Sequence, residues 1–227
     1  MLSTRATARR DVRWVGLPTE ARRAERRVLL LDAAFDLLGT EGWAGTTVRA
    51  VCQRARLNPR YFYESFDHLD ALVVAAYDRV IDELAAAVEQ SQRAAEDEPR
   101  AQVRAAVEAI VGFVDDDRRR ARILYVEALG SEALNRRRKS AGHALVTSIE
   151  RIATERWGRP PTGEQVGRMG AAMLVGGMSE LVLEWLEGHI AVTREQLVDD
   201  ATGLALAVGE AAAAIAAHRS KGRRRGR

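Results

Sequence analysis

Cysteine is almost absent from this chain. Cys52 is the only one among 227 residues, so the fold cannot rely on a disulfide within the chain. Long hydrophobic runs are missing too, and none approaches the roughly 20 apolar residues that a membrane span needs. The first 13 residues hold four arginines and no apolar segment, so we expect no secretory signal. These absences predict a cytoplasmic protein.

Proline and the alternating pattern of strands are also scarce. Only five prolines occur, and no stretch alternates apolar and polar residues as a half-buried strand does. Alanine, leucine, arginine and glutamate dominate, and all four favour helices. With 47% hydrophobic residues, the chain can bury a sizeable core. We therefore predict an all-α fold of about nine helices.

Charge is unevenly distributed, although the whole chain carries only +3. Residues 1–60 hold twelve arginines and six acidic residues, a net charge of +6. Residues 61–218 hold 17 basic and 26 acidic residues, a net charge of −9, and residues 219–227 hold six basic residues. Both ends therefore suit a polyanion and the middle does not. The alternative is that the basic ends are solvated tails.

Capping signals divide the first third of the chain into short helices. A first helix is predicted over about 19–41, and Gly42 is a natural residue to end it. Thr46 is placed to cap a second helix that ends near Ala55. Its inward face includes Cys52, which we interpret as a buried structural thiol rather than a nucleophile.

A third short helix follows after a tight turn. Asn58 is placed to cap it and Pro59 to occupy its first position, with an end near Phe66. Asp67 is placed to cap a long fourth helix. The second and third helices have the length and spacing of a helix-turn-helix, whose second helix enters the major groove of DNA. The exposed candidates on that helix are Asn58, Arg60, Tyr61 and Glu64, whereas Phe62 and Phe66 are spaced to face the core.

The run from Leu30 to Leu72 resembles the DNA-binding domain of the tetracycline-repressor (TetR) family and covers about a fifth of the chain. The matching positions are Ala33, Ala34, Leu37, Gly42, Trp43, Thr46, Thr47, Val48, Val51, Cys52, Ala55, Leu57, Phe62, Tyr63, Phe66 and Leu72. Three positions depart from the family pattern, and one of them is Asn58, which stands in place of the usual serine cap and is equivalent to it for capping. Arg56 stands where the family usually has a glycine in the turn, and Leu69 where it often has a lysine that meets a phosphate.

The resemblance implies a three-helix DNA-binding domain followed by a helical ligand-binding and dimerisation domain. The domains would be a flexible basic arm over 1–18, a DNA-binding domain over 19–68 with its helix-turn-helix at about 47–66, an effector-binding and dimerisation domain over 69–218, and a basic disordered tail over 219–227. The expected partners are a double-stranded DNA operator, a second copy of the chain and an unknown small-molecule effector, with no membrane.

The DNA-binding residues come partly from the resemblance and partly from charge. The resemblance assigns phosphate contacts to Thr47 and Tyr63 and groove positions to Asn58, Pro59, Arg60 and Tyr61. Thr46 is added because polar groups at helix N-termini can meet phosphates. Arg9, Arg10 and Arg13 of the basic arm are expected to follow phosphates or enter the minor groove. Arg60 can read guanine through O6 and N7 or contact a phosphate, and the sequence leaves both open.

The last two long helices carry apolar stripes at alternating steps of three and four residues. The resemblance implies that they form a four-helix dimer interface, whose residues would be Ala171, Leu174, Leu181, Leu197, Ala201, Leu204, Val208, Ala211 and Ile215. The alternative is that these stripes belong to the core of one chain. The resemblance also implies an effector pocket, for which the candidates are Phe113, Tyr125, His143, Met173, Met178 and Trp185. Each of these can equally be an ordinary core residue.

Signals of catalysis are missing. The four histidines lack metal-ligand spacing, and the chain has no phosphate-binding glycine loop and no nucleophile elbow. The acidic triplet at 115–117 lacks the spacing of a calcium loop and is better explained as a helix start. We therefore predict no enzyme, no metal and no cofactor. A ligand-responsive repressor is the expected function, activation by the same fold stays open, and the alternatives are an architectural DNA-binding protein or a helical enzyme.

Overall fold

The computed structural model describes residues 19–157 and 164–225, and every regular element in these ranges is a helix. The all-α prediction is therefore confirmed. The chain forms two compact units, residues 1–77 and 78–227. Their boundary lies inside α6 (Leu69–Ala94) rather than at 68/69. The first turns of α6 contribute buried side chains to the first unit, so the long helix belongs to both: Leu72, Val73, Ala76 and Tyr77.

The first unit consists of α2 (Thr19–Thr40), the single turn α3 (Gly42–Gly45), α4 (Val48–Ala55), α5 (Pro59–Tyr63) and the start of α6. Its helix ends follow the predicted glycine signal, because Gly42 has φ +74° and ends α2 in the left-handed region. The core residues come from every element except α3: Leu30, Ala33, Ala34, Leu37, Leu38, Val51, Cys52, Phe62, Phe66 and Leu72.

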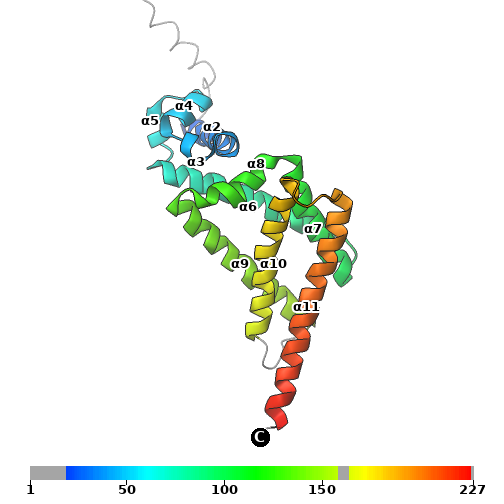
Figure 1. Ribbon diagram of the computed structural model, residues 1–227. Coiled ribbons are helices and arrows are strands. Elements are labelled where there is room, and N and C mark those ends of the chain that lie inside the picture. The colour runs from blue at the N-terminus through cyan, green and yellow to red at the C-terminus, as the bar shows by residue number, and fades with distance from the viewer. Residues whose placement is uncertain (1–18, 158–163, 226–227) are drawn as a thin grey trace, which may run out of the picture. The chain divides into compact units, whose positions relative to one another are not determined.

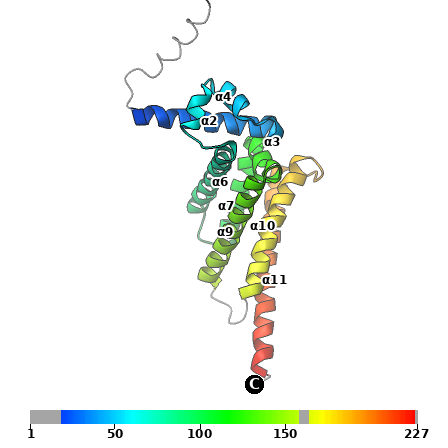
Figure 2. The same cartoon turned by 90° about the vertical axis from the view of Figure 1, so that its left-hand side faces the viewer.

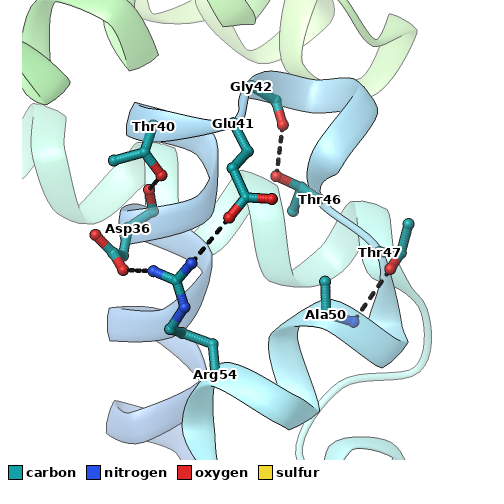
Figure 3. A network of polar contacts seen from close by, with 8 residues as sticks. All are labelled: Asp36, Thr40, Glu41, Gly42, Thr46, Thr47, Ala50 and Arg54. Carbon is teal, nitrogen blue, oxygen red and sulfur yellow. Dashed lines mark hydrogen bonds and ion pairs between the residues drawn. The ribbon is translucent and has the colours of Figure 1, made fainter.

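A polar network fastens α4 to the end of α2 (Figure 3). The guanidinium of Arg54 donates to the carboxylate of Asp36 and, at 2.8 Å, to Oε1 of Glu41. Glu41 lies against Gly45, where a Cβ atom would approach the Cβ of Glu41 to 2.6 Å. The turn between α2 and α4 therefore needs a glycine at this position for Glu41 to meet Arg54.

Two predicted caps are wrong by one residue. Thr47, not Thr46, caps α4, and its hydroxyl accepts from the Ala50 N–H at 3.1 Å. His68, not Asp67, precedes α6, and its Nδ1 accepts from the Ala71 N–H at 3.1 Å. In both places adjacent residues can accept the same hydrogen bond, so the tertiary position of the backbone selects between them.

The second unit is a helical bundle in which two neighbouring helices, α10 (Glu164–Leu186) and α11 (Arg194–Arg225), are antiparallel (Figure 1). Figure 1 and Figure 2 show α10 and α11 side by side, and α11 continues past the end of α10. The bundle packs α7 (Pro99–Asp116) against α11 and α9 (Glu132–Trp157) against α10. After α6 its elements are α7 (Pro99–Asp116), α8 (Arg118–Ala121), the π-helix η2 (Arg122–Val126), the 3-10 helix η3 (Glu127–Leu129), α9 (Glu132–Trp157), α10 (Glu164–Leu186) and α11 (Arg194–Arg225).

Two predictions in this unit need correction. Only Asp117 of the acidic triplet caps a helix, accepting from the Arg119 N–H at 3.1 Å, while Asp115 and Asp116 end α7. The hydrogen bond from the Arg119 side chain lowers the pKa of Asp117 below its ordinary value. The predicted disordered tail is also wrong over residues 219–225, because α11 continues through Arg225. The composition of residues 219–225 explains this, since arginine and lysine are good helix formers.

The turn between α4 and α5 places Arg56 in the left-handed region, with φ 55° and ψ 39°. This left-handed conformation costs an L-residue about 1 kcal/mol. Arg56→Gly should return roughly half of that, since glycine is also freer in the unfolded chain. We expect hydrogen exchange of the Leu57 amide, which donates to the Cys52 carbonyl at 2.9 Å, to slow about twofold. Arg56→Ala keeps the Cβ atom, and equal exchange in the two variants would contradict the strain.

Candidate DNA-binding site

The recognition helix α5 begins where the sequence predicts. Asn58 caps it by accepting the Arg60 N–H at 2.9 Å, and Pro59 occupies the first turn. Phe62 and Phe66 anchor the helix to the core of the domain. They are 0% and 5% exposed, and their ring centres lie 6.1 Å apart. Both aromatic predictions are confirmed, and they leave one face of α5 toward solvent.

The outward face of α5 presents most of the predicted groove residues. Asn58, Pro59 and Arg60 are exposed, and the side chain of Arg60 is 82% exposed. Tyr63 is 60% exposed and meets Phe62 edge-on at 5.2 Å. Tyr61 is half-buried, because the guanidinium of Arg26 covers its ring at 4.3 Å. Tyr61 is therefore less available to DNA than Asn58, Pro59, Arg60 and Tyr63.

Two arginines of α2, Arg26 and Arg27, make contacts within the domain. Arg26 donates to Oε2 of Glu64 at 3.3 Å, and Glu64 also accepts from Nε of Arg60 at 3.0 Å. Arg27 lies over the Phe66 ring at 4.1 Å and donates to the Ser65 carbonyl at 3.0 Å. These contacts fasten the end of α5 to α2, a link that the sequence pattern does not reveal because the partners lie 38 residues apart.

The two threonines before α4 have different environments. Thr47 is exposed at the N-terminus of α4, where a phosphate can approach the helix. Thr46 is only 2% exposed, and its hydroxyl donates to the Gly42 carbonyl at 2.8 Å. Thr46 therefore stabilises the turn and does not offer its hydroxyl to DNA. Arg9, Arg10 and Arg13 lie outside the described residues.

The predicted effector residues do not form one buried set in the single chain. Phe113 is buried and receives Arg120 over its ring at 4.2 Å. Tyr125, Met178 and Trp185 are half-buried, and the Trp185 indole donates to the Val192 carbonyl at 3.0 Å. His143 is exposed and Met173 is 66% exposed. Aromatic and methionine residues were therefore a weak guide to a pocket.

Buried polar atoms without partners indicate a candidate ligand site that the sequence analysis did not identify. Among the described residues of the second unit, Arg120 Nε, Asn135 Oδ1 and Arg138 Nε are buried without a hydrogen-bond partner. Such atoms are costly unless something satisfies them. These atoms come from α8 and α9, whereas the six predicted effector residues are spread over four elements.

The turn after α10 brings together a group that sequence spacing did not suggest. Glu184, Glu187 and His189 offer ligand atoms within 4.8 Å of one another. Nδ1 of His189 lies 3.2 Å from Glu184 and 3.5 Å from Glu187, beside Gly188 with φ +82°. His189 and Glu187 are exposed, so the group forms a polar cluster at the surface.

Cys52 is buried, as predicted, and burial raises the pKa of its thiol. A thiol with a raised pKa is a poor nucleophile at neutral pH. The interpretation of Cys52 as a structural residue in α4 is therefore supported.

Comparison with known proteins gives the same picture. Residues 30–76 match the family model "Bacterial regulatory proteins, tetR family". The HTH-type transcriptional regulator BetI of Burkholderia thailandensis is 28% identical over 181 residues, which cover 77% of this chain and 87% of that protein. The matches are to regulators rather than enzymes.

Solved structures of low sequence identity share the fold. A protein of Pseudomonas aeruginosa PAO1 assigned as a transcriptional regulator aligns with a TM-score of 0.71 and 21% identity, over 92% of this chain and 98% of that one. A TetR-like transcriptional regulator of a Rhodococcus species aligns with a TM-score of 0.64 and 23% identity, over 84% and 96%. On these grounds residues 30–76 match the tetR family of bacterial regulatory proteins, and the similarities support a DNA-binding transcriptional regulator.

Proposed function

We propose that the chain acts in the cytoplasm as a homodimer that binds a pseudo-palindromic operator and represses transcription until a small molecule releases it. The main support for DNA binding is the outward face of α5. Asn58, Arg60 and Tyr63 are exposed there, while Phe62 and Phe66 are buried on the opposite side. Thr47 at the start of α4 adds a phosphate contact. The net charge of +6 over residues 1–60 favours a polyanion.

An exposed apolar face on α10 supports the dimer. Met169 and Met173 are 60% and 66% exposed, and Ala172, Gly176 and Gly177 lie exposed along the same side. A row of small residues lets a second helix approach closely. On α11, Leu204 is 63% exposed, and Ala207 and Ala211 continue its side. Single chains rarely expose such continuous apolar surface unless it binds something.

The predicted interface residues divide between core and surface. Ala171, Leu197 and Ala201 are buried within one chain, whereas Leu204, Ala211 and Ile215 are exposed. Leu174, Leu181 and Val208 have intermediate exposure. The apolar stripes therefore contribute partly to the core of one chain and partly to an exposed surface, which are the two alternatives left open by the sequence. The exposed members, together with the methionine face of α10, are the surface we assign to the partner.

A membrane is the competing occupant of this surface. Two segments, Gln165–Leu186 and Arg194–Arg219, are long and apolar enough to cross a bilayer by length and composition, and only 17% of each segment's most apolar 18-residue window is buried. However, α10 carries Glu180 and Glu184, and a charged group at the centre of a bilayer costs about 3 kcal/mol. A second protein chain accommodates such groups at the rim of its interface, so we favour the dimer.

Met173→Glu tests the dimer. Burial of one methionine contributes about 2 kcal/mol, and a dimer loses two of them, so the dimer dissociation constant should rise at least about 100-fold. Sedimentation equilibrium measures it, and operator affinity should fall with dimerisation. Ser148→Glu on the exposed side of α9 is the control. An unchanged dimer would contradict the assignment, as would a monomeric wild-type chain that partitions into lipid vesicles.

Footprinting on the promoter beside the chain's own reading frame tests operator binding. We expect a protected pseudo-palindrome with half-sites about one helical turn apart, because a two-fold dimer places one recognition helix in each of two major grooves. Uniform coverage would favour an architectural DNA-binding protein. Absence of DNA affinity would refute the regulator.

Deletion of residues 1–13 tests the basic arm, which contains four arginines. If all four meet phosphates in both subunits, the slope of log affinity against log salt should flatten by up to about 7. Deletion of residues 219–227 removes six basic residues from the other end and is the matched control. An unchanged slope after deletion of 1–13 would show that the arm does not contact DNA.

The effector proposal is supported by the buried polar atoms of Arg120, Asn135 and Arg138, which a polar ligand can satisfy. Coupling requires that the ligand bind one state of the dimer better than the other. Promoter binding measured with and without candidate ligands tests this. Ligands that bind without altering operator affinity would contradict the coupling, and ligands that strengthen binding would indicate activation.

A further inference from the structure

The guanidinium of Arg60 is held at one edge only. Its Nε–H donates to Oε1 of Glu64 at 3.0 Å, at the end of α5. Its terminal NH1 and NH2 groups have no partner among the described residues, and the side chain is 82% exposed. The edge between NH1 and NH2 is therefore open to a ligand.

Glu64 is itself fastened from outside α5. Its second oxygen, Oε2, accepts from Arg26 of α2 at 3.3 Å. The side chain of Arg26 is only 13% exposed, and its guanidinium also covers the Tyr61 ring at 4.3 Å. Glu64 therefore cannot follow a moving Arg60 without giving up Arg26. The carboxylate of Glu64 therefore fixes the orientation of the Arg60 guanidinium plane.

A guanidinium with a fixed plane suits a base better than a phosphate. Two parallel N–H groups of an arginine match O6 and N7 of guanine in the major groove. An unrestrained arginine loses rotamer entropy when it binds, and the contact with Glu64 has already removed part of that freedom. A phosphate at the same place would also meet the negative charge of Glu64, which repels it.

We propose that Glu64 is a positioning residue that determines sequence specificity, because it orients Arg60 so that the NH1–NH2 edge reads a guanine. The proposal rests on the proposed operator binding. It assigns base reading to Arg60 of α5 and the orientation of Arg60 to Glu64, which caps the end of that helix. Glu64 does not read a base itself. Both of its oxygens are engaged by arginines, and its side chain is 35% exposed.

Selection of binding sites from random duplex DNA tests the proposal with the full chain. Glu64→Gln keeps the shape of the side chain and removes its charge, and Asp67→Asn removes the same charge from an exposed neighbour. Glu64→Gln should lower the preference for guanine about tenfold at one symmetric pair of positions, and Asp67→Asn should leave every preference unchanged. In an Arg60→Ala background, Glu64→Gln should cause no further change in preference.

A change in the DNA tests the same contact without altering the protein. In 7-deazaguanine a C–H group replaces N7, so one acceptor for Arg60 is lost. The wild-type chain should bind the modified operator about tenfold more weakly than the natural one. Glu64→Gln should show less than a threefold difference, because a neutral amide oxygen holds Arg60 in the reading plane more weakly than a carboxylate does.

Three results would overturn the proposal. The first is a guanine preference that survives Glu64→Gln, and the second is an equal loss of 7-deazaguanine binding in both proteins. The third is a change of preference at a cytosine in the Arg60→Ala background, which would assign base reading to Glu64. A merely structural role would weaken binding to all sequences alike. A wild-type chain that selects no sequence would instead refute operator binding itself.

Discussion

A helix of five residues cannot hold its own shape in water, and the function of this chain depends on one. Isolated helices need about 12–15 residues to be even marginally stable, whereas α5 spans only Pro59–Tyr63. Its order comes from outside: Phe62 and Phe66 are buried beneath it, and Arg27 closes over the Phe66 ring. DNA recognition is therefore a property of the domain core, since the exposed side chains of α5 are oriented only while that core is packed.

The polar contacts of the first unit contribute orientation more than stability. Arg54 joins Asp36 and Glu41, but all three side chains are partly exposed, and such pairs contribute about 0–1 kcal/mol. Their geometric effect is larger, because one guanidinium from α4 reaches two carboxylates at the end of α2. The angle between these helices decides where Thr47 lies relative to α5. The network and the buried phenylalanines beneath α5 thus act together, one setting the helix-turn-helix geometry and the other its stability.

The sequence predicted the all-α fold, most of the long helices and the buried face of α5 because these depend on local patterns. The Asn58 cap was predictable from a local hydrogen bond, yet the same rule failed at Thr46 and Thr47, where two equivalent caps are adjacent. Contacts between distant residues, such as Arg26 with Glu64, leave no periodic signal. The apolar faces of α10 and α11 were only partly predictable, because helices that are apolar on several sides do not reveal which side faces a partner.

Acidic charge in a DNA-binding protein is usually a cost, but here its placement supports selectivity. Residues 61–218 carry a net charge of −9, which disfavours nonspecific contact of the larger unit with DNA and leaves binding to the basic N-terminal residues. Glu64 repeats this effect at the scale of a single side chain. A carboxylate beside Arg60 weakens the attraction of the guanidinium to any phosphate. A guanine that accepts hydrogen bonds from the open edge of the guanidinium compensates for this loss of binding energy. Because a regulator competes against a large excess of nonspecific sites, the ratio of the two affinities matters more than either affinity alone.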